Sequence, residues 1–353
     1  MAATAALGGP VGAGAPAGPR RAPRHGRPAA LALGLLAALA LLVLAVGLSV
    51  AVGSRSVPLG AVWSALVAPD GSFVSTVVAS RVPRTVLGLL VGAALAVAGA
   101  LVQGLTRNPL GDPGLLGVNA GAATSVVLVS ALVGTTAGRT PWAAVPGALA
   151  AAVVVHLVGA GGRSVSPVRL VLAGAAVSAV LGAVIQSLVL ARPETFDTYR
   201  FWVLGSLAGR TPEVVAQVAP FIAVGLVLAL VLARPLDALA LGDEAATALG
   251  LRPGLTRVVG LLAATLLVAG AVAAAGPIAF VGLAVPHVVR GLTGPDHRWL
   301  VPYCAVLGPV LLLGSDVVGR VVARPGEIVV GAVTAFVGAP FLVAAVRRGR
   351  VAG

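Results

Sequence analysis

The chain of 353 residues is 58% hydrophobic and only 10% charged, with a mean hydropathy of +1.05. These values lie far outside those of soluble globular domains and predict a membrane protein. The net charge of +13 comes from arginine, because the sequence contains no lysine. These arginines are scattered between apolar stretches rather than gathered on one face, which excludes a nucleic-acid-binding protein. The missing lysine excludes a phosphate-binding loop of the type G-x-x-x-x-G-K-[ST], so we expect ATP hydrolysis, if the function needs it, on another chain.

The first segment, residues 1–28, is a basic tail rich in Ala, Gly and Pro, which we expect to be disordered and cytoplasmic. An apolar run over about residues 29–52 follows it. A cleavable signal peptide is the alternative interpretation, but the run exceeds the roughly 7–15 apolar residues of such a peptide. We therefore expect an uncleaved first span.

Further along the chain, apolar stretches long enough to cross a bilayer recur, each needing about 20 residues. They cover residues 29–52, 85–106, 114–134, 142–160, 169–191, 213–233, 257–275, 277–292, 300–318 and 328–346. We expect an all-α polytopic membrane protein with a transmembrane domain over 29–348 and a cytoplasmic end at 349–353. The segments predicted to lie inside carry more arginines than those outside, which indicates that both termini are cytoplasmic.

The segment from 81 to 121 joins the second and third spans and is the most informative part of the sequence. Arg81 and Arg84 stand at the start of the second span. Small residues then recur at every fourth position: Gly88, Gly92, Ala96, Ala100 and Gly104. Such a stripe predicts a close approach by a neighbouring helix. The helix should end at R-N-P, because Pro109 lacks a backbone donor and restricts the residue before it.

The loop over about residues 236–256 predicts a short cytoplasmic helix between the sixth and seventh spans. Asp243 and Glu244 suit the beginning of a helix, and Gly250 suits its end. The residues that form this segment are Gly242, Asp243, Glu244, Ala246, Leu249 and Gly250. An ordinary amphipathic connector resting on the membrane is the alternative.

These motifs closely resemble the permease subunits of ATP-binding-cassette importers for iron–siderophores, haem and cobalamin, the FecCD/BtuC type. The resemblance runs from about Arg81 to the C-terminus, with Val82 and Gly111 as mild departures from the family pattern. The matching positions in the first block are Arg81–Arg84, Gly92–Ala96, Gly99, Gln103, Arg107, Asn108, Pro109, Asp112 and Pro113. Those in a second, later block are Gly276, Pro286, His287 and Arg290. Pro286 is expected to break the eighth span.

The resemblance implies roles for two groups of residues and names the partners. Arg81, Arg84 and Arg320 would meet carboxylates of an extracytoplasmic substrate-binding protein, or alternatively mark span ends by reaching lipid headgroups. The predicted loop helix would lie in a groove of an ATPase subunit dimer, which holds the ATP and magnesium. A second permease copy, identical or related, would complete the pathway in the cell membrane. This chain itself would bind no cofactor and would not be an enzyme.

Two other classes compete with an importer permease. A secondary transporter driven by an ion gradient would need acidic residues near the middle of the membrane, and the sequence offers no convincing one. An intramembrane enzyme would need a nucleophile and base in a recognisable motif. The four histidines, one cysteine and one methionine are dispersed, so we expect no metal site, and iron would cross already chelated. The resemblance does not choose between a ferric siderophore, haem and cobalamin.

Overall fold

The computed structural model describes residues 28–54, 56–133, 140–159, 167–192, 196, 199–200 and 202–347. Across these ranges the regular structure is entirely helical. Of the tail predicted at 1–28, residues 1–27 lie outside the described residues, as does the predicted end at 349–353. The elements are α1 (Pro28–Ala51), α2 (Leu59–Val67), α3 (Phe73–Thr106), η1 (Pro113–Leu116), α4 (Val118–Val133), α5 (Thr140–Gly159), α6 (Pro167–Ala191), α8 (Pro212–Ala240), α9 (Asp243–Ala248), α10 (Pro253–Ala275), α11 (Val281–Thr293), α12 (His297–Val322) and α13 (Val330–Arg347).

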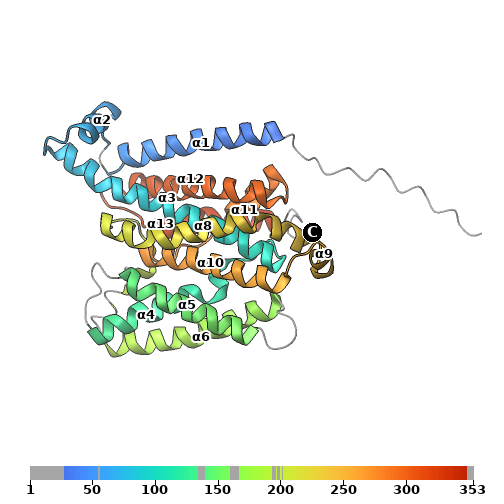
Figure 1. The fold of residues 1–353 in the computed structure, drawn as a ribbon. Helices are drawn as coiled ribbons and strands as arrows, with labels where there is room; N and C mark the ends of the chain where they lie inside the picture. The colour runs from blue at the N-terminus through green and yellow to red at the C-terminus, as the bar shows by residue number, and fades with distance from the viewer. Residues whose placement is uncertain are drawn as a thin grey trace, which may run out of the picture.

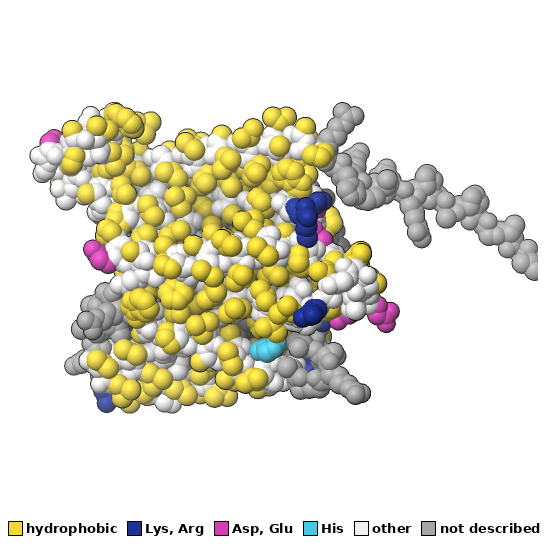
Figure 2. All heavy atoms as spheres, viewed as in Figure 1, with side chains coloured by type: hydrophobic (Ala, Val, Ile, Leu, Met, Phe, Trp, Pro, Cys, Tyr) yellow, Lys and Arg dark blue, Asp and Glu magenta, His cyan; other side chains and the backbone are white. Residues whose placement is uncertain are grey.

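Each of the predicted spans overlaps one helix of this part of the chain. Seven of these helices are long and apolar enough to cross a membrane, whereas α4, α11 and α13 are shorter. Large apolar side chains are exposed on their outer faces, among them Leu33, Val231 and Phe336. A hydrophobic surface covers the side of the bundle between its two ends (Figure 2). A bilayer stabilises such a surface, whereas water does not.

The helices run alongside one another, so the bundle has two ends (Figure 1). We call them the α2 end, where α1 and α12 finish and α3 begins, and the α9 end, where α3 and α8 finish and α10 and α12 begin. Helix α3 is central, with 83% of its most apolar window buried. Helix α1 lies at one edge, and α4, α5 and α6 form a group at the other.

The predicted small-residue stripe of α3 faces α12. A Cβ on Gly92 would lie 2.6 Å from the backbone nitrogen and Cα of Pro309, and one on Gly104 would lie 2.7 Å from Nε2 of His297. A neighbouring small residue, Gly99, faces the backbone carbonyl of Gly282 on α11 so closely that a Cβ there would overlap it. Backbone-to-backbone contact therefore joins α3 to two partners, as the stripe predicts.

The start of α3 differs from the prediction. The second span was expected at residue 85, but the helix begins at Phe73, where the side chain of Ser72 accepts a hydrogen bond from the backbone of Ser75 at 3.2 Å. Such a cap satisfies one of the free donors of a helix start. Arg81 and Arg84 consequently lie inside α3 rather than before it, and this places their side chains among neighbouring helices.

Candidate functional site

The helix α9 is a six-residue helix between α8 and α10, as the loop pattern predicts. Gly242 precedes it with φ 114° and Gly250 follows it with φ 81°. Residues with a side chain rarely adopt such angles, so glycine suits both positions. The backbone N–H of Leu251 donates to the carbonyl of Ala246 at 3.0 Å and closes the helix end.

Helix α9 lies at its end of the bundle (Figure 1), and most of its residues are exposed. Ala246 is the residue of this helix that is buried, and it contacts the protein beneath. Glu244 is exposed, and the flanking Leu241 and Leu249 are 69% and 64% exposed. A short helix with two exposed leucines beside it can fill an apolar groove on a partner.

Asp243 at the first position of α9 joins two arginines from other elements. Arg257 on α10 donates from both terminal nitrogens, to Oδ2 at 2.8 Å and to Oδ1 at 2.7 Å. Arg107 donates from Nη2 to Oδ1 at 2.9 Å. Hydrogen bonds from Arg257, and then the charges of both arginines, hold the pKa of the Asp243 carboxyl below its ordinary value. The side chain therefore stays ionised at neutral pH.

The predicted R-N-P stop ends α3 at Thr106. Arg107 has φ 50°, and Asn108 Oδ1 accepts the backbone N–H of Leu110 at 2.9 Å, which forms a local turn. Asp112 then accepts the backbone N–H of Gly114 at 2.7 Å and begins η1 with Pro113. Burial raises the pKa of the Asp112 carboxyl, although this hydrogen bond opposes the rise.

Pro286 does not break its helix, because α11 continues from Val281 to Thr293. Proline has no N–H to donate, so the carbonyl of Gly282 loses its usual partner four residues on. Gln103 of α3 donates from Nε2 to this carbonyl at 3.3 Å. Arg290 in turn donates from Nη1 to Oε1 of Gln103. The family-motif residues Gln103, Pro286 and Arg290 thus form one polar joint between α3 and α11.

The remaining motif positions have structural settings. His287 follows Pro286 on α11 and is partly exposed. Gly276 ends α10 with φ 76°, and a Cβ there would overlap the backbone carbonyl of Trp202. Glycine is therefore required at this turn.

At the α2 end, two of the three predicted docking arginines are buried. Arg81 is 8% exposed and donates from Nη1 to the carbonyls of Val50 and Ala51, at 2.8 and 3.1 Å. Arg320 is 2% exposed and donates from Nη1 to the carbonyl of Ser49 at 2.9 Å. These carbonyls belong to the last turn of α1, where helix carbonyls lack intrahelical partners and cations are favoured.

Arg84 and two acids, Asp316 and Glu327, lie at the same end, and we call them together with Arg81 and Arg320 the arginine cluster. Asp316 of α12, 1% exposed, accepts from Arg84 Nη2 at 2.8 Å and lies 3.1 Å from Arg320 Nη2. Arg84 also donates from Nη1 to Glu327 at 2.8 Å. The side chain of Arg84 is 13% exposed and that of Glu327 is 36% exposed, so these two face the surface. Asp316 precedes Arg320 by four residues on α12, a spacing that brings two side chains together on one face of a helix.

Comparison with known proteins decides the family. The model of the FecCD transport family matches residues 41–348. The chain belongs to the FecCD transport family. It is 47% identical to the ferric enterobactin transport system permease protein FepD of Escherichia coli, over 88% of this chain and 93% of that protein. It is 38% identical to the cobalamin import system permease protein BtuC of Halobacterium salinarum, over 87% and 86% of the two chains.

A solved structure agrees with this assignment. It is described as an inward-facing conformation of a metal-chelate type ABC transporter, with a TM-score of 0.77 and 28% identity. The match covers 90% of this chain and 99% of that chain. The FecCD chain is thus an all-helical, multi-pass membrane protein of the ABC permease class.

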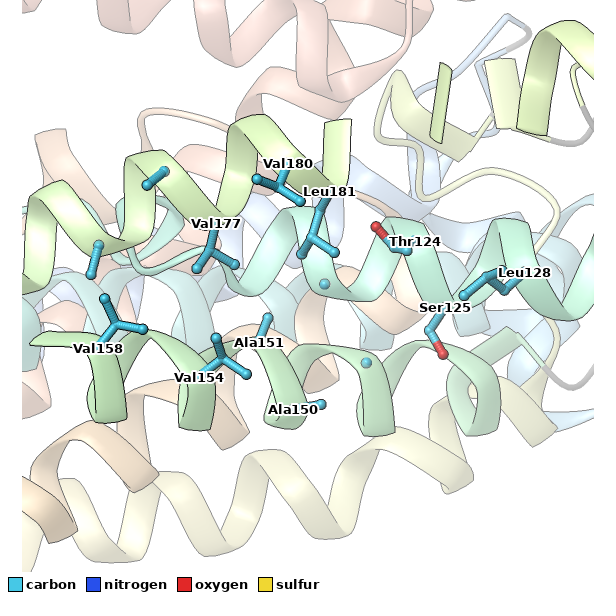
Figure 3. Close-up of a pocket in the computed structure, with 14 residues that line it drawn as sticks. Thr124, Ser125, Leu128, Ala150, Ala151, Val154, Val158, Val177, Val180 and Leu181 are labelled. Carbon is cyan, nitrogen blue, oxygen red and sulfur yellow. The ribbon is translucent and has the colours of Figure 1, made fainter. Parts of the chain in front are cut away.

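An apolar cavity of about 510 Å³ lies between α4, α5 and α6 of the FecCD chain. Val177 from α6 points toward Val154 from α5 there, and Leu128 from α4 lies toward one end of the cavity (Figure 3). Thr124 and Ser125 bring hydroxyl groups to its wall. Such a lining suits hydrocarbon and gives a charged ligand no ionic partner.

Some residues of both ends were not foreseen. Three of them belong to none of the predicted motifs: Arg257, Glu327 and Asp237. Their partners are Asp243 of the loop helix, Arg84 and His297, in that order. Asp237 lies 2.6 Å from Nδ1 of His297 and joins α8 to α12. An acid or base at a span end within an otherwise apolar sequence is the signal that could have found them. Within the described ranges, no group of three or more His, Cys, Asp or Glu side chains is placed to hold a metal ion.

Proposed function

We propose that the chain is the membrane-spanning permease subunit of an importer for a ferric siderophore, driven by ATP that a separate ATPase subunit dimer binds with magnesium and hydrolyses. The observation that carries the substrate is the 47% identity to a ferric enterobactin permease over nearly the whole of both proteins. This chain would bind no cofactor of its own. Its task would be to alternate between outward-open and inward-open states.

The α9 end would face the cytoplasm, with both termini on that side. The excess of arginine in the segments at this end supports this orientation. Helix α9, with Leu241 and Leu249 exposed beside it, would enter a groove of the ATPase subunit. A second permease copy, the same chain or a related one, would pack against this one and form the pathway between them.

The α2 end would face the substrate-binding protein outside the membrane. Because Arg81 and Arg320 already bond to α1, Arg84 is the arginine best placed to meet a carboxylate of that protein. Charge reversal at Arg81 should disturb the end of α1. Docking is therefore better tested with Arg84→Lys alone, which keeps the charge beside Asp316 and loses the planar fork that bonds a carboxylate at two points; we expect it to weaken the binding of the purified substrate-binding protein.

Cobalamin is the second candidate substrate, because the relative from Halobacterium salinarum is named a cobalamin import permease. Haem is the third, through the family resemblance.

Uptake by cells with and without this gene tests the proposal. The cells receive radio-iron as a panel of siderophore chelates, and in parallel labelled cobalamin and haemin. The proposal expects that uptake of one siderophore chelate is lost without the gene and returns with it. Loss of cobalamin or haemin uptake instead would assign that substrate, and unchanged uptake of all three classes would contradict an import role.

A further inference from the structure

The helix α9 has little apolar packing to hold it in place. It spans six residues, and Ala246 is the buried one. Helices this short are not stable alone, because each end leaves backbone groups without partners and nucleation is costly. The orientation of α9 must therefore depend on specific contacts with the longer helices around it.

The carboxylate of Asp243 supplies those contacts. It receives the two-pronged bond from Arg257 on α10 and a third bond from Arg107, which follows α3. The same Nη2 of Arg107 donates to the carbonyl of Leu239 at 2.6 Å, in the last turn of α8. One carboxylate thus links α9 to α10 and to the end of α3, and Arg107 extends the link to α8.

The backbone conformation of Arg107 directs its side chain toward α8 and α9. Its φ of 50° lies in the left-handed region, which residues with a side chain seldom occupy. The residue belongs to the R-N-P turn, so the side chain leaves the end of α3 toward α8 and α9 rather than continuing the helix. The central helix α3 is thereby joined directly to a short and largely exposed helix.

We propose that Asp243 is a positioning residue that, through Arg107 and Arg257, makes α9 move as one body with α3 and α10. The inference rests on the proposed function, because it is a moving ATPase subunit that would displace α9. The displacement would then reach the two helices that pack most deeply in the bundle, and through α3 the α11 and α12 backbones that touch it.

The link should matter more for coupling than for stability. The side chain of Asp243 is 48% exposed and that of Arg107 is 42% exposed. Exposed ion pairs contribute about 0–1 kcal/mol to folding, so a variant without the carboxylate should fold. Coupling between two sites typically changes the affinity at one of them about fivefold or more, which sets the size of effect to look for.

The first test measures the mobility of α9 and so asks whether Asp243 anchors this helix; it needs no transport. A spin label is attached at Ala248→Cys, an exposed position of α9, in a chain whose buried Cys304 is replaced by Ala. We expect Asp243→Asn to make the label clearly more mobile, and Asp243→Glu to restore much of the order. The matched control is Arg252→Gln, which removes an exposed charge from the same connector. Unchanged mobility in Asp243→Asn, or equal mobility in the control, would overturn the proposal.

The second test measures ATP hydrolysed per chelate imported by the complete transporter in liposomes. We expect Asp243→Asn and Arg107→Gln to raise this ratio about fivefold or more while the ATPase subunit still co-purifies. A ratio equal to that of the wild type, or loss of the ATPase subunit from the complex, would overturn the positioning role. A wild-type chain that imports no chelate would count against the proposed function, and the spin-label result would still decide about the anchor.

Discussion

The arginine cluster at the α2 end predicts that Asp316→Asn destabilises the protein strongly. The variant keeps the shape of the side chain and removes the charge that faces Arg84 at 2.8 Å and Arg320 at 3.1 Å. Asp316 is 1% exposed and Arg320 is 2% exposed, so a guanidinium would remain buried without its counterion. Removing one partner of a buried pair costs about 3–5 kcal/mol.

The structure places the expected cost at the lower end of that range, about 3 kcal/mol. Arg84 retains Glu327 and some access to solvent, and the amide oxygen of the new side chain can still accept one hydrogen bond. For a chain of this length, about 3 kcal/mol corresponds to a melting temperature lower by about 4 °C.

The single cysteine provides the assay. Cys304 is fully buried in α12, so a thiol-reactive dye that fluoresces on coupling reports its exposure as the purified protein unfolds. Asp70→Asn is the matched control, because Asp70 is an exposed acid at the same end and should change stability by less than about 0.5 kcal/mol. If Asp316→Asn melted together with Asp70→Asn, the reasoning about the buried cluster would be refuted.

Three further predictions concern the helix contacts and the α9 end. Gly99→Ala should lower the melting temperature in the same assay, since a Cβ would overlap a carbonyl of α11, whereas Gly182→Ala, which meets no atom within 4 Å, should not. Gln103→Leu should cost about 1–3 kcal/mol, because it leaves a carbonyl and a guanidinium of α11 without their partner; a melting temperature equal to that of the wild type would contradict the joint. The pKa of Asp243 is lowered below the ordinary value of about 3.9, so its contribution to stability is present above about pH 4 and is lost as the pH falls through the folded value. Melting curves below pH 4 should therefore fall less steeply for Asp243→Asn than for the wild type, and parallel curves would exclude this contribution.

The sequence predicts local features of the fold well. Apolar length locates the spans, the small-residue stripe of α3 predicts its close contacts, and glycine and proline mark the ends of α9 and α3. These features depend on a few neighbouring residues, so the chain alone contains the needed information. Helix α2 was missed because its nine residues are too few to read as a span, although Trp63 within it is exposed as an interfacial ring would be.

Pairing between distant residues could not be predicted. Arg81 and Arg320 read as surface groups at span ends, whereas the structure buries them against the end of α1. Both arginines are buried because α1 ends beside them, and no pattern in the neighbouring sequence predicts where α1 ends relative to the other helices. The pairing of Gln103 with the carbonyl left free by Pro286 has the same origin: the proline predicts an unpaired carbonyl, but only the packing of α3 on α11 selects its donor.

The energy source of chelate uptake separates an ATP-driven importer from a transporter driven by an ion gradient, and it can be measured in vesicles. Right-side-out membrane vesicles that contain this chain and its native partners are loaded with ATP or left without it, and the ion gradients are then collapsed. We expect that radio-iron chelate enters only the ATP-loaded vesicles and continues to enter after the gradients are gone. Uptake that needs a gradient and proceeds without ATP would contradict this expectation and would favour an ion-coupled secondary transporter.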